Sequence, residues 1–163
     1  MGFFCRSNEP DPVCPICGSH LKHYDYKYRN MKLEGGIVKV LKIRRLLCPC
    51  CHALHNELPD CLSPYKHYAT EVIEGALEGI VNPFDEESED YPSTDSIKRW
   101  KSWLYEIRKL LFVTIRTRWS LIPDNILKLV LSNSLLLSFR EELRYNWLQI
   151  LLKLIYNYLQ PFY

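Results

Sequence analysis

Two stretches in the first third of the chain alternate in polarity from one residue to the next, as β-strands do. Residues 20–30 alternate polar and aromatic side chains, and residues 37–43 are rich in β-branched side chains with a similar alternation. Between them lies Glu34-Gly35-Gly36, which supplies the glycines that a tight reversal of the chain needs. The pattern predicts a β-hairpin.

Beyond residue 67 the apolar residues recur with the period of an α-helix. Up to residue 80, one helix face collects apolar side chains, and the opposite face collects the acidic residues Glu71, Glu74 and Glu78. Asn82-Pro83 ends this predicted helix. Residues 82–91 follow as an acidic connector, which we expect to be a solvated loop.

A second helix is predicted after Pro92, because Ser93 or Thr94 can cap its first free amides and Asp95 suits the positive end of its dipole. Two further helices are predicted over residues 126–139 and 143–159. The first of these is too short and polar to span a membrane, and the last is apolar nearly all round. We therefore expect no membrane association, and we favour a homodimer through the C-terminal helices over a bundle within one chain.

The predicted hairpin lies between two Cys-x-x-Cys pairs. Cys14 and Cys17 precede it, and Cys48 and Cys51 follow it. Each pair can curl into a knuckle whose amides point at two thiolates, so two facing knuckles supply the four soft ligands of a tetrahedral zinc site. We predict one structural Zn²⁺ on these four cysteines, with His52 in place of Cys51 as the alternative ligand.

A pair of structural disulfides is the rival interpretation of the same cysteines. The total of seven cysteines is odd, which argues against a complete disulfide framework. Nothing before Cys5 resembles a signal peptide, so an oxidising compartment has no support and we expect a cytoplasmic protein. Cys5, Cys50 and Cys61 are expected to be bystanders.

These predictions combine into an α+β fold. A zinc ribbon, which is a β-hairpin whose open end is held by metal-binding knuckles, is expected over residues 1–66. A helix-turn-helix-like segment follows over residues 67–104, and a helical region over residues 105–163. Within the ribbon, we expect residues 1–13 to be poorly ordered and the prolines to break regular structure in residues 55–66. The ribbon's own core is so small that metal binding and folding should share one free energy.

The formal net charge of +2 hides a strong segregation. Residues 1–67 carry +4, residues 68–91 carry −8, residues 92–119 carry +5 and residues 120–163 carry +1. Basic side chains bind DNA phosphates by charge and counterion release, and tyrosines beside them can stack or donate hydrogen bonds. A solvated lysine face and an ordinary surface helix are the alternatives. The candidate DNA contacts are Lys27, Arg29, Lys39, Lys42, Arg44, Arg45, Lys98, Arg99 and Lys101.

Several of these features occur together in a recognisable order. They are two cysteine pairs, a basic hairpin between them, two arginines before the second pair and a Leu-Pro … Pro-Tyr stretch, at Cys14, Cys17, Arg44, Arg45, Cys48, Cys51, Glu57, Leu58, Pro59, Pro64, Tyr65 and Lys66. This combination, over roughly residues 12–104, resembles the N-terminal region of certain bacterial insertion-sequence transposases and related short bacterial proteins.

The resemblance implies a zinc ribbon and a helix-turn-helix that together bind DNA at the ends of a mobile element, with a transposase as partner. In that arrangement the helix after Thr94 would enter the major groove. Arg99 would then meet guanine edges, and Lys98 or Lys101 would meet phosphates.

No catalytic constellation emerges from the sequence. A transposase reaction needs carboxylates that gather two metal ions on a mixed α/β core, and no series of strands follows the ribbon. Four cysteines would also leave no open coordination position for hydrolysis. We therefore expect DNA binding without catalysis, in an accessory protein of a mobile element or in a truncated transposase remnant. A zinc-ribbon adaptor for protein–protein interaction is the alternative from another class.

Overall fold

The computed structural model describes residues 3–6, 11–80, 92–117, 141 and 146–158. The predicted hairpin is confirmed: strands β2 (Lys22–Lys32) and β3 (Val38–Leu47) pair antiparallel. A single 3-10 turn, η1 (Glu34–Gly36), reverses the chain, and in it Gly35 has a φ of 70°. Glycine adopts this left-handed conformation without a steric penalty, which is why the reversal falls at this position.

Two further strands extend the sheet beyond the hairpin. Strand β4 (Leu54–Leu58) pairs antiparallel with β3, and β1 (Phe3–Arg6) pairs parallel with β4, so the strand order is β1-β4-β3-β2. The expectation that residues 1–13 are poorly ordered and residues 55–66 irregular is therefore wrong for these strands. Pro59 does not prevent β4 from forming, because it follows the last residue of the strand.

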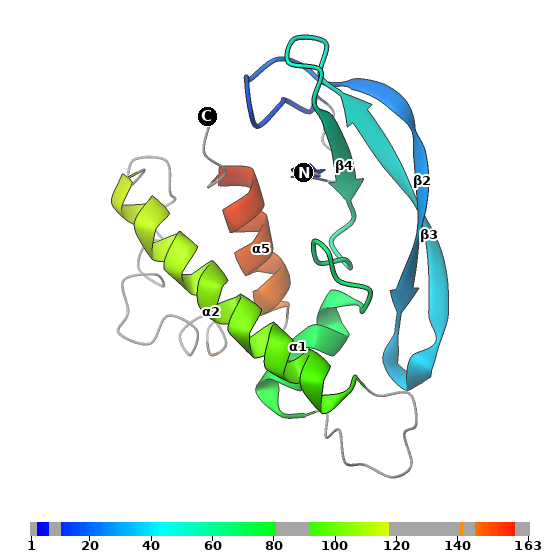
Figure 1. Cartoon of the computed structure of the whole chain (residues 1–163), viewed down its shortest axis with the longest axis vertical. Helices are drawn as coiled ribbons and strands as arrows, with labels where there is room; N and C mark the ends of the chain where they lie inside the picture. The colour runs from blue at the N-terminus through cyan, green and yellow to red at the C-terminus, as the bar shows by residue number, and fades with distance from the viewer. Residues whose placement is uncertain (1–2, 7–10, 81–91, 118–140, 142–145, 159–163) are drawn as a thin grey trace.

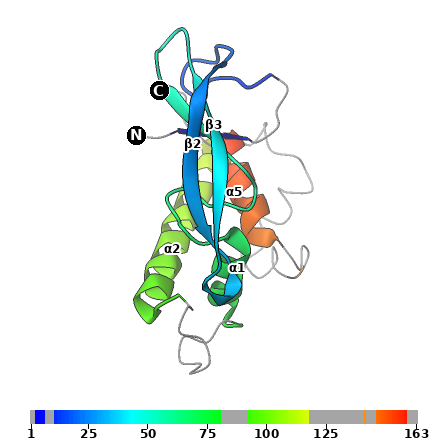
Figure 2. The ribbon, with the colours of Figure 1, turned by 90° about the vertical axis from the view of Figure 1, so that its right-hand side faces the viewer.

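The register of the hairpin sorts its side chains into two rows, because residues directly opposite each other share a face. The outer row contains the opposed pairs Tyr26–Arg44 and Tyr28–Lys42. The inner row contains the remaining alternate residues, among them Asp25, Lys27, Arg29, Met31, Lys39, Leu41, Ile43 and Arg45. Figures 1 and 2 show that the helices lie together on one side of the hairpin.

Three helices are described. They are α1 (Thr70–Glu78), α2 (Thr94–Thr117) and α5 (Trp147–Tyr158). Helix α1 contacts both α2 and α5, and α5 also contacts β1. The start of α2 confirms the predicted cap, since the N–H of Ser96 donates to the Oγ of Ser93 at 3.3 Å. Helix α5 lies within the predicted 143–159, whereas the predicted helix over 126–139 and the acidic connector 82–91 lie outside the described residues.

The inner row of the hairpin packs against α1 through one hydrophobic cluster. Met31 and Ile43 from the hairpin meet Leu58 and Leu62, and Ala69 and Val72 complete the cluster from the start of α1. The end of the hairpin is also joined to α1 through the backbone, because Lys32 accepts a hydrogen bond from the N–H of Ala69 at 2.8 Å. The fold class is therefore α+β, with a sheet and a layer of helices that share a core.

One helix face differs from its prediction. Glu74 was expected on the solvent side of α1, yet only 8% of it is exposed. Its carboxylate accepts a hydrogen bond from the backbone N–H of Leu148, at the start of α5. Conversely, Ile80 was expected on the apolar face and is 76% exposed. Helix α1 therefore presents a carboxylate to α5 from a position that the helical pattern assigns to solvent.

No helix in the described ranges is both long enough and apolar enough to cross a membrane.

Candidate metal centre and nucleic-acid interface

The first Cys-x-x-Cys pair lies in a loop that its own backbone closes. The N–H of Cys14 donates to the carbonyl of Ser19 at 2.8 Å, and the N–H of Gly18 donates to the carbonyl of Cys14 at 2.8 Å. Gly18 has a φ of 73°, so the loop ends on a left-handed residue. Cys14 is buried and Cys17 is exposed.

The second pair lies in a loop of the same construction. The N–H of Cys48 donates to the carbonyl of Ala53 at 3.0 Å, and the N–H of His52 donates to the carbonyl of Cys48 at 3.1 Å. His52 has a φ of 57°, again left-handed. The two loops match position by position, so Cys51 occupies the place that Cys17 has in the first loop.

This correspondence separates the candidate ligands of the second loop. Cys50 stands where Ile16 stands in the first loop, and it is exposed. His52 stands where Gly18 stands, at the residue that ends the loop rather than at one that carries a ligand. The sulfur of Cys51, not the imidazole of His52, joins the group of potential ligands.

The four sulfur atoms meet across the two loops. Cys14 Sγ lies 3.6 Å from Cys51 Sγ, and Cys17 Sγ lies 3.4 Å from Cys48 Sγ. All four lie within 4.8 Å of one another. Zinc–sulfur bonds of about 2.3 Å at tetrahedral angles place sulfurs about 3.8 Å apart, so this spacing fits a metal ion. The cysteines are free, and the separations are far longer than the roughly 2.05 Å of a disulfide.

The thiols of the cluster differ in acidity. Burial raises the pKa of the Cys14 thiol to about 12, whereas a hydrogen bond with the Ser19 side chain lowers the pKa of Cys17 to about 6. Thiolates, not thiols, ligate metals. A bound cation would supply the positive charge that keeps a buried thiolate such as that of Cys14 ionised.

A histidine that sequence reasoning did not select lies beside this cluster. His55 on β4 is fully buried, and its Nε2 lies 3.4 Å from Cys14 Sγ. Burial lowers the pKa of His55, which favours the neutral imidazole. The sequence signal for His55 is the period of two along β4. It places residue 55 on the same face of the sheet as Leu46, its partner on β3. Of the other extra cysteines, Cys61 is exposed, and Cys5 lies on β1 in register with Glu57 of β4.

Three arginines among the candidate DNA contacts are engaged within the fold. Arg44 makes a bidentate ion pair with the buried carboxylate of Glu57, at 2.6 and 2.7 Å. Arg45 makes a second bidentate pair, with Asp25. Arg29 donates to the carbonyls of residues 63 and 66. These guanidinium groups hold strands and loops together, so they are less available to a ligand than the sequence suggests.

The three lysine candidates of the hairpin remain exposed. Lys27, Lys39 and Lys42 make no ion pair with any residue that the structure describes. Lys42 lies over the ring of Tyr26, 4.1 Å from its centroid. The register does not gather these lysines on one face, because Lys27 and Lys39 belong to the inner row and Lys42 to the outer row.

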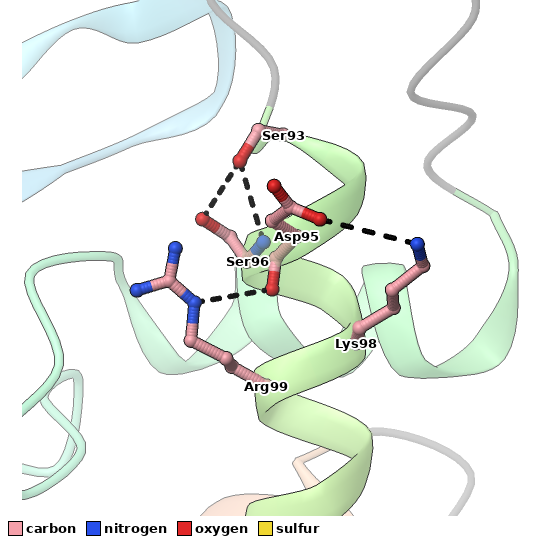
Figure 3. A network of polar contacts seen from close by, with 5 residues as sticks. All are labelled: Ser93, Asp95, Ser96, Lys98 and Arg99. Atoms are coloured by element: carbon pink, nitrogen blue, oxygen red, sulfur yellow. Dashed lines mark hydrogen bonds and ion pairs between the residues drawn. The ribbon is translucent and has the colours of Figure 1, made fainter.

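The remaining candidates lie on the first turns of α2, and Figure 3 shows two of them, Lys98 and Arg99. Lys98 Nζ lies 3.9 Å from a carboxylate oxygen of Asp95, and Arg99 Nε donates to the carbonyl of Asp95 at 3.3 Å. Lys98, Arg99 and Lys101 are all exposed. These cations belong to a different element from the hairpin lysines, so the predicted contacts form two groups.

Comparison with known proteins identifies one family. Residues 14–100 match a family model described as a domain of unknown function, DUF6431. The match includes both cysteine loops, the hairpin, β4, α1 and the first turns of α2. No curated protein and no solved structure matches the chain.

Proposed function

The chain belongs to the DUF6431 family, and we propose that it is a zinc-dependent DNA-binding protein in which a zinc ribbon and a helix-turn-helix act together. The proposal includes association with a mobile element, as the transposase resemblance implies. It also includes a structural role for the metal: four thiolates complete a tetrahedral site, which leaves no position at which a metal-bound water could be activated.

The observation that carries the proposal is the set of exposed lysines on a hairpin anchored by the cysteine cluster. Lys27, Lys39 and Lys42 are exposed and project from both rows of a two-stranded ribbon. The major groove of DNA admits a two-stranded ribbon, and exposed lysines on such a ribbon can contact phosphates. The inner row packs against α1 at Met31 and Ile43, so a DNA contact by the outer row would use Lys42.

The helical part supplies the second half of the proposed reader. Helix α2 begins at a serine cap and exposes Lys98, Arg99 and Lys101 within its first turns. A recognition helix presents its N-terminal residues to base edges, and arginine is the side chain that most often reads guanine. Tyr68 joins the two halves, because its ring packs edge-on against Trp100 of α2 at 5.1 Å while its backbone bridges to Lys32 of β2.

The test combines zinc analysis with DNA selection. The purified protein is assayed for bound zinc, and its binding to a mixed pool of duplexes is measured at two salt concentrations. One equivalent of zinc together with selectable, salt-sensitive binding is the expected result. Zinc with no DNA binding would contradict the function and leave the metal site intact.

A protein-interaction adaptor is a second candidate, favoured by one observation. Ile37, Val38 and Val40 are 64%, 52% and 60% exposed near the turn of the hairpin. Exposed β-branched side chains grouped in this way are typical of protein contacts. Binding to a partner protein with no dependence on DNA would favour this function. Partnership with a transposase and dimerisation through the C-terminal helices remain proposals that the same purified protein can test.

A further inference from the structure

A groove of about 620 Å³ lies between the hairpin and the segment that follows β4. Its lining includes Lys27 and Tyr28 of β2, Asn56 of β4, and Tyr65 and His67 of the following segment. Within the described part of the chain, no acidic residue lines the groove. Its size falls in the range of small-ligand sites, about 300–1,000 Å³, and its charge suits an anion.

The far wall of the groove is a tight turn. The N–H of Lys66 donates to the carbonyl of Ser63 at 3.2 Å, so residues 63–66 form a β-turn with Pro64 and Tyr65 at its centre. Proline at the first central position and a positive φ at the second are the features of a type II turn. Arg29 fixes this turn to the hairpin by donating to the carbonyls of Ser63 and Lys66.

Tyr65 occupies the turn position that normally holds glycine. Its φ is 59°, in the left-handed region where a side chain is sterically costly. Tyr65 is 64% exposed at the groove, so its side chain can contact a ligand there. Strained conformations of this kind cluster at ligand-binding sites.

The chemistry of the lining defines the ligand class. Tyr65 is aromatic and 64% exposed, which suits stacking with a nucleobase. Lys27 and His67 can contact a phosphate, and the Asn56 amide can both donate to and accept from a base edge. A paired base has both faces covered and its Watson–Crick edge occupied, so only an unpaired nucleotide could use all three groups.

We propose that this groove binds an unpaired nucleotide within a DNA strand, with Tyr65 as the stacking residue. The inference rests on the proposed function, because the strand belongs to the DNA that the ribbon and α2 bind. It adds that the protein recognises single-stranded DNA, such as an end or junction, through a site that shares Lys27 with the proposed duplex contacts but also contains Tyr65.

The experiment measures the affinity of the zinc-loaded full chain for a fluorescent oligothymidylate and for a duplex with the same label. Tyr65→Gly removes the ring and relieves the positive φ, and Tyr65→Asn removes the ring with a residue that also tolerates that conformation. Tyr105→Ala removes a tyrosine of α2 that is 57% exposed and lies outside the groove lining, which makes it the matched control. Thermal unfolding of each variant reports whether it folds.

Both Tyr65 variants are expected to bind the oligothymidylate about tenfold more weakly, to keep duplex affinity within about twofold, and to unfold at the same or a higher temperature than the wild type. Tyr105→Ala is expected to change neither affinity. If both Tyr65 variants bind the oligothymidylate as tightly as the wild type does, the groove is not the single-strand site. The proposed binding to duplex DNA would be unaffected by that result. Equally tight binding of thymidine monophosphate would overturn the assignment to a strand, and a wild-type protein that binds neither DNA would refute the proposed function as well.

Discussion

The carboxylate of Glu74 accepts a hydrogen bond from the backbone N–H of Leu148 at 3.1 Å. Leu148 is the second residue of α5, where the first backbone amides have no partner within the helix. Four residues further along α1, Glu78 accepts a hydrogen bond from the indole N–H of Trp147 at 2.7 Å. Two acidic residues of α1 therefore hold the start of α5, and Glu74 acts as the cap for a helix distant in sequence.

Replacement of Glu74 tests this connection. Glu74→Ala leaves buried amides of α5 without an acceptor, and we expect it to lower the free energy of unfolding by about 1–3 kcal/mol. Glu74→Gln keeps an acceptor oxygen and is the matched control, with an expected loss smaller than that of alanine. Chemical denaturation followed by tryptophan fluorescence measures both, because Trp147 is buried at this contact. Equal losses in the two variants would show that the charge, not the hydrogen bond, matters.

The same residue predicts a dependence on pH. Burial, with a smaller contribution from the neighbouring charge of Glu78, raises the pKa of Glu74. A group whose pKa is higher in the folded state stabilises the fold when protonated, and that contribution is lost as the pH rises through the folded pKa. The stability of the wild type relative to Glu74→Gln should therefore decrease as the pH rises above the ordinary pKa of a glutamate, about 4.3. Denaturation curves of both proteins across this range provide the measurement, and a constant difference would contradict it.

The cysteine cluster predicts a contrast between adjacent residues. Cys51→Ser should lose metal binding and unfold the knuckle end of the hairpin, because metal binding and folding share one free energy. Cys50→Ser should keep one equivalent of metal and wild-type thermal stability, since Cys50 is exposed outside the cluster. Metal content and circular dichroism of the two proteins separate them. Loss of metal in the Cys50 variant would show that Cys50 is a ligand and that the assignment above is wrong.

The left-handed residues of the two loops predict opposite effects of substitution. His52→Gly should retain the metal and raise the free energy of unfolding by up to about 1 kcal/mol, because glycine adopts this φ without strain. Gly18→Ala introduces a side chain at a φ of 73° and should lower the free energy of unfolding by about 1 kcal/mol. Metal titration and thermal unfolding test both. Reduced metal affinity in His52→Gly would indicate that His52 is a metal ligand.

The two groups of exposed cations predict different losses of DNA affinity. Lys39→Ala or Lys42→Ala should weaken binding to every duplex and reduce the slope of log affinity against log salt by about 1. Arg99→Ala should cost about 1–3 kcal/mol on the selected sequence and little on random duplex. Titrations of both DNAs at several salt concentrations distinguish the two classes. An equal loss on both DNAs for Arg99→Ala would exclude α2 as the recognition helix.

The cysteine loops and the hairpin were predictable because their signals are local. The Cys-x-x-Cys spacing, the period of two in the strands and the glycines of the reversal each act within a few residues. Strand β4 was missed because it buries His55 and Glu57, which look like solvent residues in the sequence. Their partners, Cys14 and Arg44, lie 41 and 13 residues away in sequence, so only the folded chain shows these two contacts.

The basic residues show the same limit for the candidate site. Charge alone could not distinguish Arg44 and Arg45, which are paired with carboxylates, from Lys42, which is exposed. The position of Tyr65 in a glycine-type turn was also hidden, because proline and tyrosine in succession carry no signal for a positive φ. Pairing between strands and loops, rather than residue type, decides which side chains can meet a ligand.

The strand order has a consequence for the behaviour of the protein at high concentration. Within the part of the chain that the structure describes, strand β2 is the edge of the sheet over eleven residues. Apart from the bridge between Lys32 and Tyr68, its outward backbone groups there offer a template on which a second copy could add its own strand. Lys22, Lys27 and Lys32 recur along that edge, so two such strands would bring like charges together. Repulsion between these lysines therefore disfavours pairing of two edge strands, and we expect that neutralising them lowers solubility.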